Sequence, residues 1–391
     1  MTLLARAALS TRHSGRLTRP SPRGAGLALI AGLAVLAALL TGCEAANPTS
    51  PPRRAAKARP PIAAVDRLSL EQQVGQTLIL AFAGTNEPSY VGRILRRRRA
   101  AGVILTGANV ASPGQVRALT RGLERSARGL ALIGADQEGG ATRTLPFSAA
   151  TTPQSGQPDA AAAGAAARAT GRALRRLGLN VDFAPVADVA SGDASIMRSR
   201  AFPGDAAAVA EATAAAVAAY AAAGVAATAK HFPGLGAASA NTDDAAVTVA
   251  ASRAQLDRRD LQPFRAAIAA GVPLVMVSHA LYPALDPARI ASQSPRVLDD
   301  LLRRSLGFRG VVVTDSIEAA AVRRRSSVQI AAGRSIAAGA DLVLMTGPGS
   351  YHLIYPYLLA RARRSPAFRA RVRQAAARVL ALERRIGPDA R

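Results

Sequence analysis

The sequence contains no tryptophan, one cysteine, four histidines and only two lysines among its 391 residues. A single cysteine, Cys43, excludes an internal disulfide. His231, His279 and His352 lie in separate segments without metal-ligand spacing, so we expect no metal, and no cofactor motif is present. Aromatic residues make up 4% of the chain, so the core has to pack mainly through alanine, valine and leucine.

Positive charge greatly exceeds negative charge. Lysine and arginine number 50 against 25 aspartates and glutamates, which gives a formal net charge of +25. Such a balance is typical of proteins that bind nucleic acid or an anionic surface. The arginines, however, are spread over helical segments, as at Arg93 and 96–99, without interleaved aromatic residues or a recognition motif. We therefore expect solvated helix faces and no nucleic-acid partner, with attraction to anionic lipid or wall polymer as the alternative.

The N-terminal segment has the features of a bacterial export signal. Residues 1–42 contain five arginines and no acidic residue, and an apolar run spans residues 24–40. The run ends in Leu-Thr-Gly before Cys43, which resembles the lipobox of bacterial lipoproteins. The resemblance implies that Cys43 is lipidated and anchors the protein to the cell membrane on its extracytoplasmic face. A transmembrane anchor is the alternative, although the run is short for a span of about 20 residues.

The rest of the chain divides into a tether and one domain. Residues 43–63 are rich in proline, alanine and arginine, which predicts an extended tether. Residues 64–391 alternate short apolar runs with longer helical patterns, and Ser69 followed by Gln72 predicts a capping box for the first helix. Eight runs are strand candidates: 77–82, 102–106, 130–135, 180–184, 226–231, 273–278, 310–314 and 341–345. Eight βα units predict an α/β fold, a TIM (β/α)8 barrel, with no second domain, and we expect a monomer.

Ionisable residues follow these runs, at the strand ends where catalytic groups gather in such barrels. Each one taken singly has a structural alternative: Asp136 can shape a turn, His231 can be a satisfied core residue, and Asp315 can be a structural carboxylate. Lys230 is one of only two lysines in an arginine-rich chain. Its compact ammonium with three donors suits sugar hydroxyls better than a guanidinium fork would.

Four segments, taken together, resemble family 3 glycoside hydrolases of the single-domain β-N-acetylglucosaminidase kind. They are Asp136-Gln-Glu-Gly-Gly, Asn180-Val-Asp-Phe-Ala-Pro-Val-Ala-Asp188 with the following Arg200-Ala-Phe202, Lys230-His231-Phe-Pro-Gly, and Gly310-Val-Val-Val-Thr-Asp315. The resemblance implies that Asp315 is the nucleophile. It also implies that the sugar is bound by Asp136, Arg200, Lys230 and His231. One departure is Ala141, which stands where the family usually has an arginine.

The loop after Lys230-His231 also departs from the family pattern. In the acetylglucosaminidase branch it carries Asp-Ser-His, whose histidine is the acid/base, and here Asn241, Thr242 and Asp243 stand in its place. Asp243 or its neighbour Asp244 can serve as a carboxylic acid/base, because adjacent carboxylates raise one another's pKa. Alternatively the loop does not catalyse, since Asn-Thr-Asp-Asp also favours a turn. We take Asp243 as the acid/base.

These features predict an enzyme that hydrolyses terminal β-linked N-acetylglucosamine from peptidoglycan-derived or related glycans, with retention, through a covalent glycosyl-aspartate. The alternative is a catalytically impaired family member that binds wall sugars as a lipoprotein. A third class, a lipid-tethered scaffold for another protein, would need an apolar surface stripe that the sequence does not show.

Overall fold

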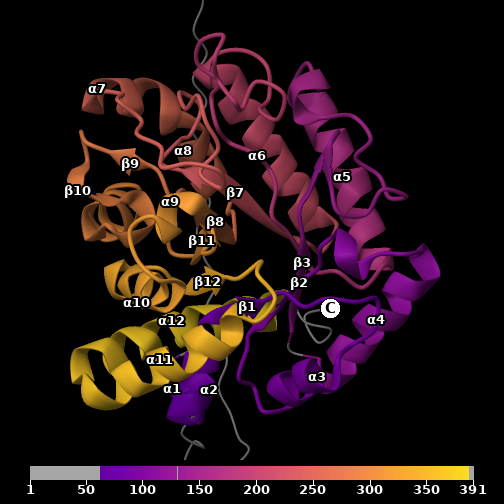
Figure 1. The fold of residues 1–391 in the computed structure, drawn as a ribbon. Coiled ribbons are helices and arrows are strands. Elements are labelled where there is room, and N and C mark those ends of the chain that lie inside the picture. The colour runs from indigo at the N-terminus through magenta and orange to yellow at the C-terminus, as the bar shows by residue number, and fades with distance from the viewer. Residues whose placement is uncertain (1–61, 130, 387–391) are drawn as a thin grey trace, which may run out of the picture. The chain divides into compact units, whose positions relative to one another are not determined.

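The computed structural model describes residues 62–129 and 131–386, so the predicted signal segment and Cys43 lie outside the described part. Eight parallel strands close into a barrel, and strands that follow one another in the chain are neighbours in the ring (Figure 1). They are β1 (Leu78–Leu80), β2 (Gly102–Ile104), β3 (Leu132–Ala135), β6 (Val181–Asp182), β7 (Ala226–Phe232), β8 (Leu274–Val277), β11 (Val311–Ser316) and β12 (Leu342–Leu344). Each overlaps one of the eight predicted runs, and the (β/α)8 barrel is confirmed.

Helices surround the barrel and connect its strands (Figure 1). The α-helices are α1 (Ile62–Val65), α2 (Leu70–Gly75), α3 (Ser89–Arg96), α4 (Pro113–Ala127), α5 (Ala160–Arg176), α6 (Ala206–Ala222), α7 (Arg253–Gln255), α8 (Gln262–Ala269), α9 (Ala320–Arg323), α10 (Val328–Ala338), α11 (Ser350–Arg364) and α12 (Pro366–Ile386). Further helical turns are η1 (Gly107–Asn109), η2 (Gln154–Gly156), η3 (Leu256–Asp260), η4 (Ala291–Gln293) and η5 (Arg296–Ser305). The capping box predicted at Ser69 and Gln72 begins α2, and Asp159 and Asp205 cap α5 and α6. Among the described residues, no helix combines the length and apolarity needed to cross a membrane.

The core has two main layers of buried side chains. Inside the barrel, branched and aromatic residues such as Ile104, Phe183 and Val313 pack against one another, and Val379 and Leu382 of α12 join this cluster. A larger cluster fills the space between the strands and the surrounding helices. Gly102 shows how closely the strands pack, because a Cβ there would lie 1.9 Å from the carbonyl oxygen of Leu132.

Two short hairpins extend the carboxyl ends of barrel strands. The hairpin of β4 (Gln137–Gly139) and β5 (Thr142–Arg143) follows β3, and that of β9 (Leu281–Tyr282) and β10 (Asp286–Ile290) follows β8. In the first hairpin the amide nitrogen of Gln137 donates to the carboxylate of Asp182 at the end of β6, at 3.0 Å. The β4–β5 hairpin is therefore fixed to the barrel, which gives its acidic residue, Glu138, a defined position at the barrel mouth.

A fully buried carboxylate, that of Asp341, lies just before β12, at the end of the barrel opposite the two hairpins, and three arginines surround it. Asp341 pairs with Arg303, Arg371 and Arg378, and its Oδ2 accepts from the amide nitrogen of Val312 at 3.0 Å. Burial opposes ionisation of Asp341, but the three guanidiniums outweigh it and lower the pKa of this carboxyl. The cluster joins β12 to η5 and α12.

We expect Asp341→Asn to lower the free energy of unfolding by about 3–5 kcal/mol, because three partly buried guanidiniums lose their shared counter-charge. Since folding lowers the pKa of Asp341, its contribution is present at neutral pH and declines as acid protonates the folded carboxyl. Urea denaturation measures both effects. The control is Asp66→Asn, which removes the exposed pair with Arg373 and should leave the midpoint unchanged. Equal midpoints for both variants at pH 7 would contradict the expectation.

Candidate active site

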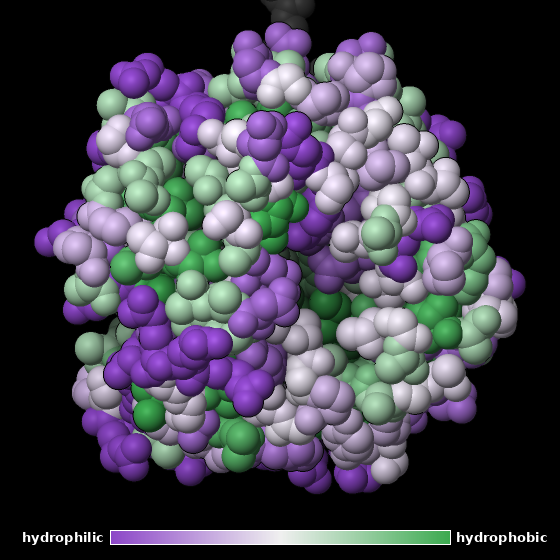
Figure 2. Space-filling view, turned by 45° about the horizontal axis from the view of Figure 1, so that its top comes forward, coloured by the Kyte–Doolittle hydropathy of each residue, from purple (hydrophilic) through white to green (hydrophobic). Residues whose placement is uncertain are grey.

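A pocket of about 340 Å³ opens at the carboxyl ends of the barrel strands. The space-filling view shows a hollow near the centre of the molecule, bordered in part by hydrophilic residues (Figure 2). The pocket brings together all six residues that the sequence predicts within the barrel, from four βα segments: Asp136, Arg200, Lys230, His231, Asp243 and Asp315. Met197, Leu235, Met276 and Leu344 supply apolar lining, as a sugar-ring site needs. Asp244, the alternative acid/base candidate, is exposed and is not part of the lining.

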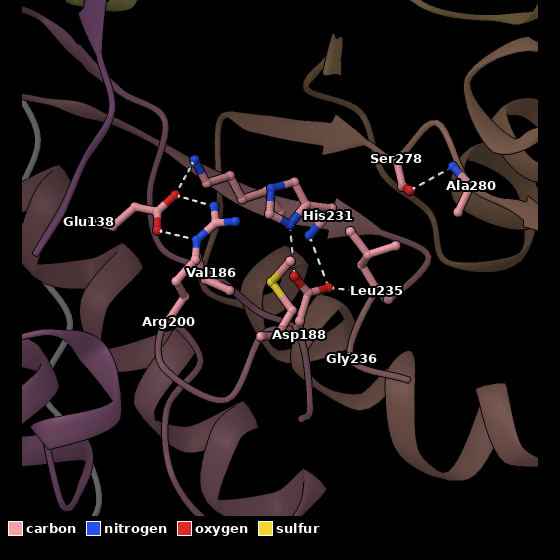
Figure 3. Close-up of polar contacts among 12 residues, drawn as sticks. Glu138, Val186, Asp188, Arg200, His231, Leu235, Gly236, Ser278 and Ala280 are labelled. Atoms are coloured by element: carbon pink, nitrogen blue, oxygen red, sulfur yellow. Dashed lines mark hydrogen bonds and ion pairs between the residues drawn. The ribbon is translucent and has the colours of Figure 1, made fainter. Parts of the chain in front are cut away.

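One side of the pocket is built around a buried carboxylate, Glu138 of β4 (Figure 3). Arg200 grips Glu138 with two hydrogen bonds of 2.8 and 2.6 Å, from Nε to Oε2 and from Nη2 to Oε1. Lys230 at the end of β7 places its Nζ 2.6 Å from Oε1 of Glu138 and 2.7 Å from Oδ1 of Asp136. The network fixes two cationic side chains and leaves the Asp136 side chain 34% exposed to the pocket.

The charges in this network stabilise one another. Burial alone would raise the pKa of the Glu138 carboxyl, but the ammonium of Lys230 and the guanidinium of Arg200 lower it to about 2. Burial likewise disfavours the charged form of Lys230, but Asp136 and Glu138 raise its pKa above the ordinary value. Glu138, Lys230 and Arg200 are therefore ionised at neutral pH. They offer fixed donors and acceptors to sugar hydroxyls without reorganising.

His231 is oriented by a second buried carboxylate. Its Nδ1 lies 2.7 Å from Oδ2 of Asp188, while Oδ1 accepts from the amide nitrogens of His231 and Leu235 at 3.2 and 2.6 Å (Figure 3). Asp188 is fully buried in the segment after β6. The pairing fixes the imidazole plane and directs the rest of the ring toward the pocket that His231 lines.

Asp315 lies near the end of β11 on the floor of the pocket. Its Oδ1 accepts from the amide nitrogen of Ser316 at 2.8 Å. Burial would raise the pKa of Asp315, but the neighbouring imidazoles of His231 and His279 and the Ser316 N–H outweigh it, so the pKa is lowered. The carboxylate is thus ionised and free of a direct salt bridge among the described residues, which suits a nucleophile.

Asp243 lies at the pocket edge, on the loop that follows β7. The residue is exposed at the rim, yet its carboxyl is crowded on the pocket side. This loss of solvation, together with the negative charge of Asp315, raises the pKa of Asp243 to about 6. The pocket therefore holds two neighbouring carboxyls with opposite pKa shifts, as an acid and a nucleophile require.

The Asp243 loop is held by backbone hydrogen bonds at both ends. The amide nitrogens of Ala320 and Ala321, in the first turn of α9, donate to the carbonyl oxygens of Asp243 and Thr242, each at 3.0 Å. At the loop base the carbonyl oxygen of Gly236 accepts from the amide nitrogen of Ser191 at 2.8 Å. A Cβ at Gly236 would lie 1.9 Å from the carbonyl oxygen of Val189, so only glycine fits here.

Sequence reasoning missed two functional residues, Glu138 and Asp188. Both stand inside the segments that identified the site. Glu138 lines the pocket, whereas Asp188 is not part of the lining and contacts the pocket residue His231. The available signal was charge balance: Arg200 and Lys230 at an interior site require a buried acid, and Glu138 is the acid beside Asp136 in the same segment. Within residues 62–129 and 131–386, no group of three or more histidine, cysteine, aspartate and glutamate side chains is placed to hold a metal ion.

Comparison with known protein families identifies the family of this chain. The glycosyl hydrolase family 3 N-terminal domain matches residues 69–382. Curated relatives of this chain carry the name β-hexosaminidase, among them two from different bacteria. The one from Stenotrophomonas maltophilia is 36% identical over 282 residues, which cover 69% of this chain and 83% of the relative. The one from Nitrosomonas eutropha is 32% identical over 280 residues, covering 68% and 80%.

Solved structures with the same barrel agree. A family 3 β-N-acetylglucosaminidase from a Paenibacillus species superposes with a TM-score of 0.78 at 35% identity, covering 82% of this chain. This chain spans 63% of the length of that protein. A β-N-acetylhexosaminidase from Beutenbergia cavernae superposes with a TM-score of 0.76 at 34% identity, covering 81% of this chain and 98% of the other.

Proposed function

Because the chain belongs to glycosyl hydrolase family 3, a family of glycosidases, we propose that it releases terminal β-linked N-acetylglucosamine with retention of configuration. The observation that carries the proposal is the carboxyl pair in the pocket. The pKa of Asp315 is lowered while that of Asp243 is raised to about 6. Retaining glycosidases need one ionised carboxylate and one protonated donor on the same sugar.

In the proposed first step, the Asp315 carboxylate attacks the anomeric carbon as the glycosidic bond breaks. Asp243 gives its proton to the leaving oxygen, and the sugar becomes an ester of Asp315. In the second step the Asp243 carboxylate takes a proton from water, the water oxygen attacks the anomeric carbon, and the ester bond to Asp315 breaks. Asp243 is thereby protonated again, so both carboxyls return to their starting states.

The buried network positions the sugar for this chemistry. Asp136 offers carboxylate oxygen as an acceptor, while Arg200 and Lys230 offer donors that Glu138 holds in place. His231 adds a ring nitrogen oriented by Asp188. These fixed charges bind several hydroxyls of one sugar ring, and they thereby hold its anomeric carbon in one position relative to Asp315.

The stereochemical course tests the proposal. With an aryl β-N-acetylglucosaminide as substrate, proton NMR should detect the β-anomer of free N-acetylglucosamine first, followed by slow mutarotation. An aryl β-glucoside should be hydrolysed more slowly if the acetamido group is recognised. First appearance of the α-anomer would overturn the covalent mechanism. Sugar binding without turnover would favour a wall-sugar-binding protein instead.

We expect Asp243→Asn to act most strongly on substrates with poor leaving groups. For an alkyl or sugar leaving group, kcat/KM should fall by about 10²- to 10⁴-fold, because such groups need the proton. For a nitrophenyl leaving group the fall should be much smaller. Wild-type kcat/KM should decline as pH rises through about 6, where Asp243 loses its proton, and the variant should lack this decline.

The matched control is Asp244→Asn, which removes the same charge from the adjacent residue outside the pocket lining. It should leave both the leaving-group dependence and the pH profile unchanged. If Asp244→Asn instead reproduces the effect, the acid/base assignment moves to that residue.

The proposed setting is the cell envelope, with peptidoglycan-derived glycans as substrates and a lipid on Cys43 as the anchor. This part of the proposal rests on the sequence of residues 24–43 alone. Metabolic labelling with a fatty-acid analogue should mark the wild-type protein, and Cys43→Ser should abolish labelling and release the protein from membranes. Labelling that persists in Cys43→Ser would refute the anchor.

A further inference from the structure

A second and larger cleft, of about 620 Å³, lies on the outside of the barrel. Its lining shares no residue with the catalytic pocket. Four arginines converge on it from four segments: Arg289 of β10, Arg325 after α9, Arg334 of α10 and Arg361 of α11. The hairpin of β10 and the helices α10 and α11 lie on the same side of the barrel (Figure 1). The remaining lining residues are Ala288, Ile290, Gln293, Pro295, Ala337 and Ala338, so the lining contains no carboxylate.

An adjoining cleft of about 190 Å³ shows how this chain neutralises arginines when their role is structural. The two clefts share Pro295, Ala337 and Ala338, but the three arginines of the smaller cleft all converge on the buried Asp341. In the larger cleft only Arg289 has an acidic partner, Asp286, at 4.0 Å. In the described part of the chain, no ion pair involves Arg325, Arg334 or Arg361. Three of its guanidiniums are therefore left without counter-charge.

Two further contacts favour a built anion site over a chance cluster. The guanidinium of Arg361 lies 4.3 Å from the ring centroid of Phe368, a stacking contact that fixes its position before any ligand binds. Gln293 is 8% exposed, and its Nε2 has no hydrogen-bond acceptor among the described residues. The lining thus provides guanidinium and amide donors from separate elements around one hollow, which is the chemistry that binds phosphate or carboxylate groups.

We propose that this cleft binds a linear polyanion, a polymer with closely spaced phosphate or carboxylate groups. Spaced anionic groups match guanidiniums that come from four elements around a cleft, whereas one small anion would engage one or two of them. The lining has no aromatic side chain on which nucleobases could stack, which disfavours nucleic acid. The charges line a recess, which suits a chain better than the flat surface of a membrane. Anion binding here does not depend on the glycosidase proposal, because the catalytic residues lie elsewhere.

The test measures binding of inorganic polyphosphate to the full chain by titration calorimetry at several salt concentrations. Arg325→Glu/Arg334→Glu should weaken binding by about tenfold or more and make the affinity less dependent on salt. The matched control, Arg172→Glu/Arg258→Glu, makes the same change of charge at two exposed arginines outside the cleft and should change the affinity less than twofold. Hydrolysis of an aryl β-N-acetylglucosaminide, or thermal melting if the protein is inactive, verifies that each variant is folded.

Two results would overturn the proposal. Equal weakening by both double variants would show attraction to net charge alone. Binding of phosphatidylglycerol vesicles, sensitive to Arg325→Glu/Arg334→Glu, without binding of polyphosphate would assign the surface to a membrane instead.

Discussion

Asp315→Ala is expected to lower kcat/KM for an aryl β-N-acetylglucosaminide by roughly 10⁴- to 10⁶-fold, the range found when a covalent nucleophile is removed. No other carboxylate can replace it at the same point, because Asp243 stands on a different loop and Glu138 is engaged by Arg200 and Lys230. Added azide should restore part of the turnover by occupying the space of the lost carboxylate. The glycosyl azide formed should then have the α-configuration.

The measurement is initial rates with and without azide, beside Asp244→Ala as a control for loss of a nearby charge. Asp244→Ala should retain most of the wild-type rate because its side chain is outside the pocket lining. Thermal melting establishes that Asp315→Ala is folded. Because the pKa of Asp315 is lowered in the folded protein, its ionised form stabilises the native state at neutral pH, and we expect some loss of stability in the variant. Undiminished turnover in the variant would remove Asp315 from the mechanism. Wild type and variant that bind N-acetylglucosamine and are equally inert would make this a sugar-binding protein on a glycosidase barrel.

Glu138→Gln is expected to lower the free energy of unfolding by about 3–5 kcal/mol, because it leaves two cations at a buried site with one carboxylate between them. Arg200 loses both of its hydrogen bonds to an ionised acceptor, and Lys230 retains only Asp136. The freed guanidinium no longer holds one position, so KM should rise as well. The neutral amide keeps the shape of the side chain, which separates the charge effect from a packing defect.

The pH dependence of this stability difference has a defined sign. Folding lowers the pKa of Glu138 to about 2, so its ionised form stabilises the native state at neutral pH. The difference between wild type and Glu138→Gln should persist down to about pH 4, the ordinary range of a glutamate, and shrink as pH falls toward 2. Urea denaturation from pH 7 to 3 measures it, with the exposed Glu211→Gln of α6 as control. A difference that grows on acidification would contradict this account.

The barrel could be predicted from the sequence because each strand is a short apolar run bounded by turn residues. The predicted run 226–231, for example, forms most of β7, and every residue of this strand is buried. Asp136, Lys230, His231 and Asp315 could be predicted as neighbours because a barrel brings strand ends together whatever their separation in the chain. Arg200 and Asp243 lie in loops after the strands, and only the resemblance to family 3 indicated them. The barrel thus places residues that are far apart in the sequence next to one another at the ends of its strands.

The supporting contacts could not be predicted because they depend on direction as well as proximity. Charge balance indicates that Arg200 and Lys230 need a buried acid, but the sequence does not show that both reach the same carboxylate, that of Glu138. The sequence does not distinguish Asp243 from its neighbour Asp244. In the structure Asp243 lines the pocket, and its loop is held by hydrogen bonds from Ala320 and Ala321 and by contacts with Asn241. The arginine cleft has the same origin, since its four residues read as ordinary solvated side chains until helix packing places them around one hollow.

The backbone hold on the Asp243 loop has a consequence for how this enzyme can change. Both hydrogen bonds from α9 end on carbonyl oxygens, at Thr242 and Asp243, and neither depends on which side chain the loop carries. The side chain that we propose as the proton donor is therefore exchangeable. Mutation can replace one ionisable side chain by another at this position while the same scaffold presents it at the same place. A barrel of this kind can vary the chemistry of its acid without rebuilding its architecture.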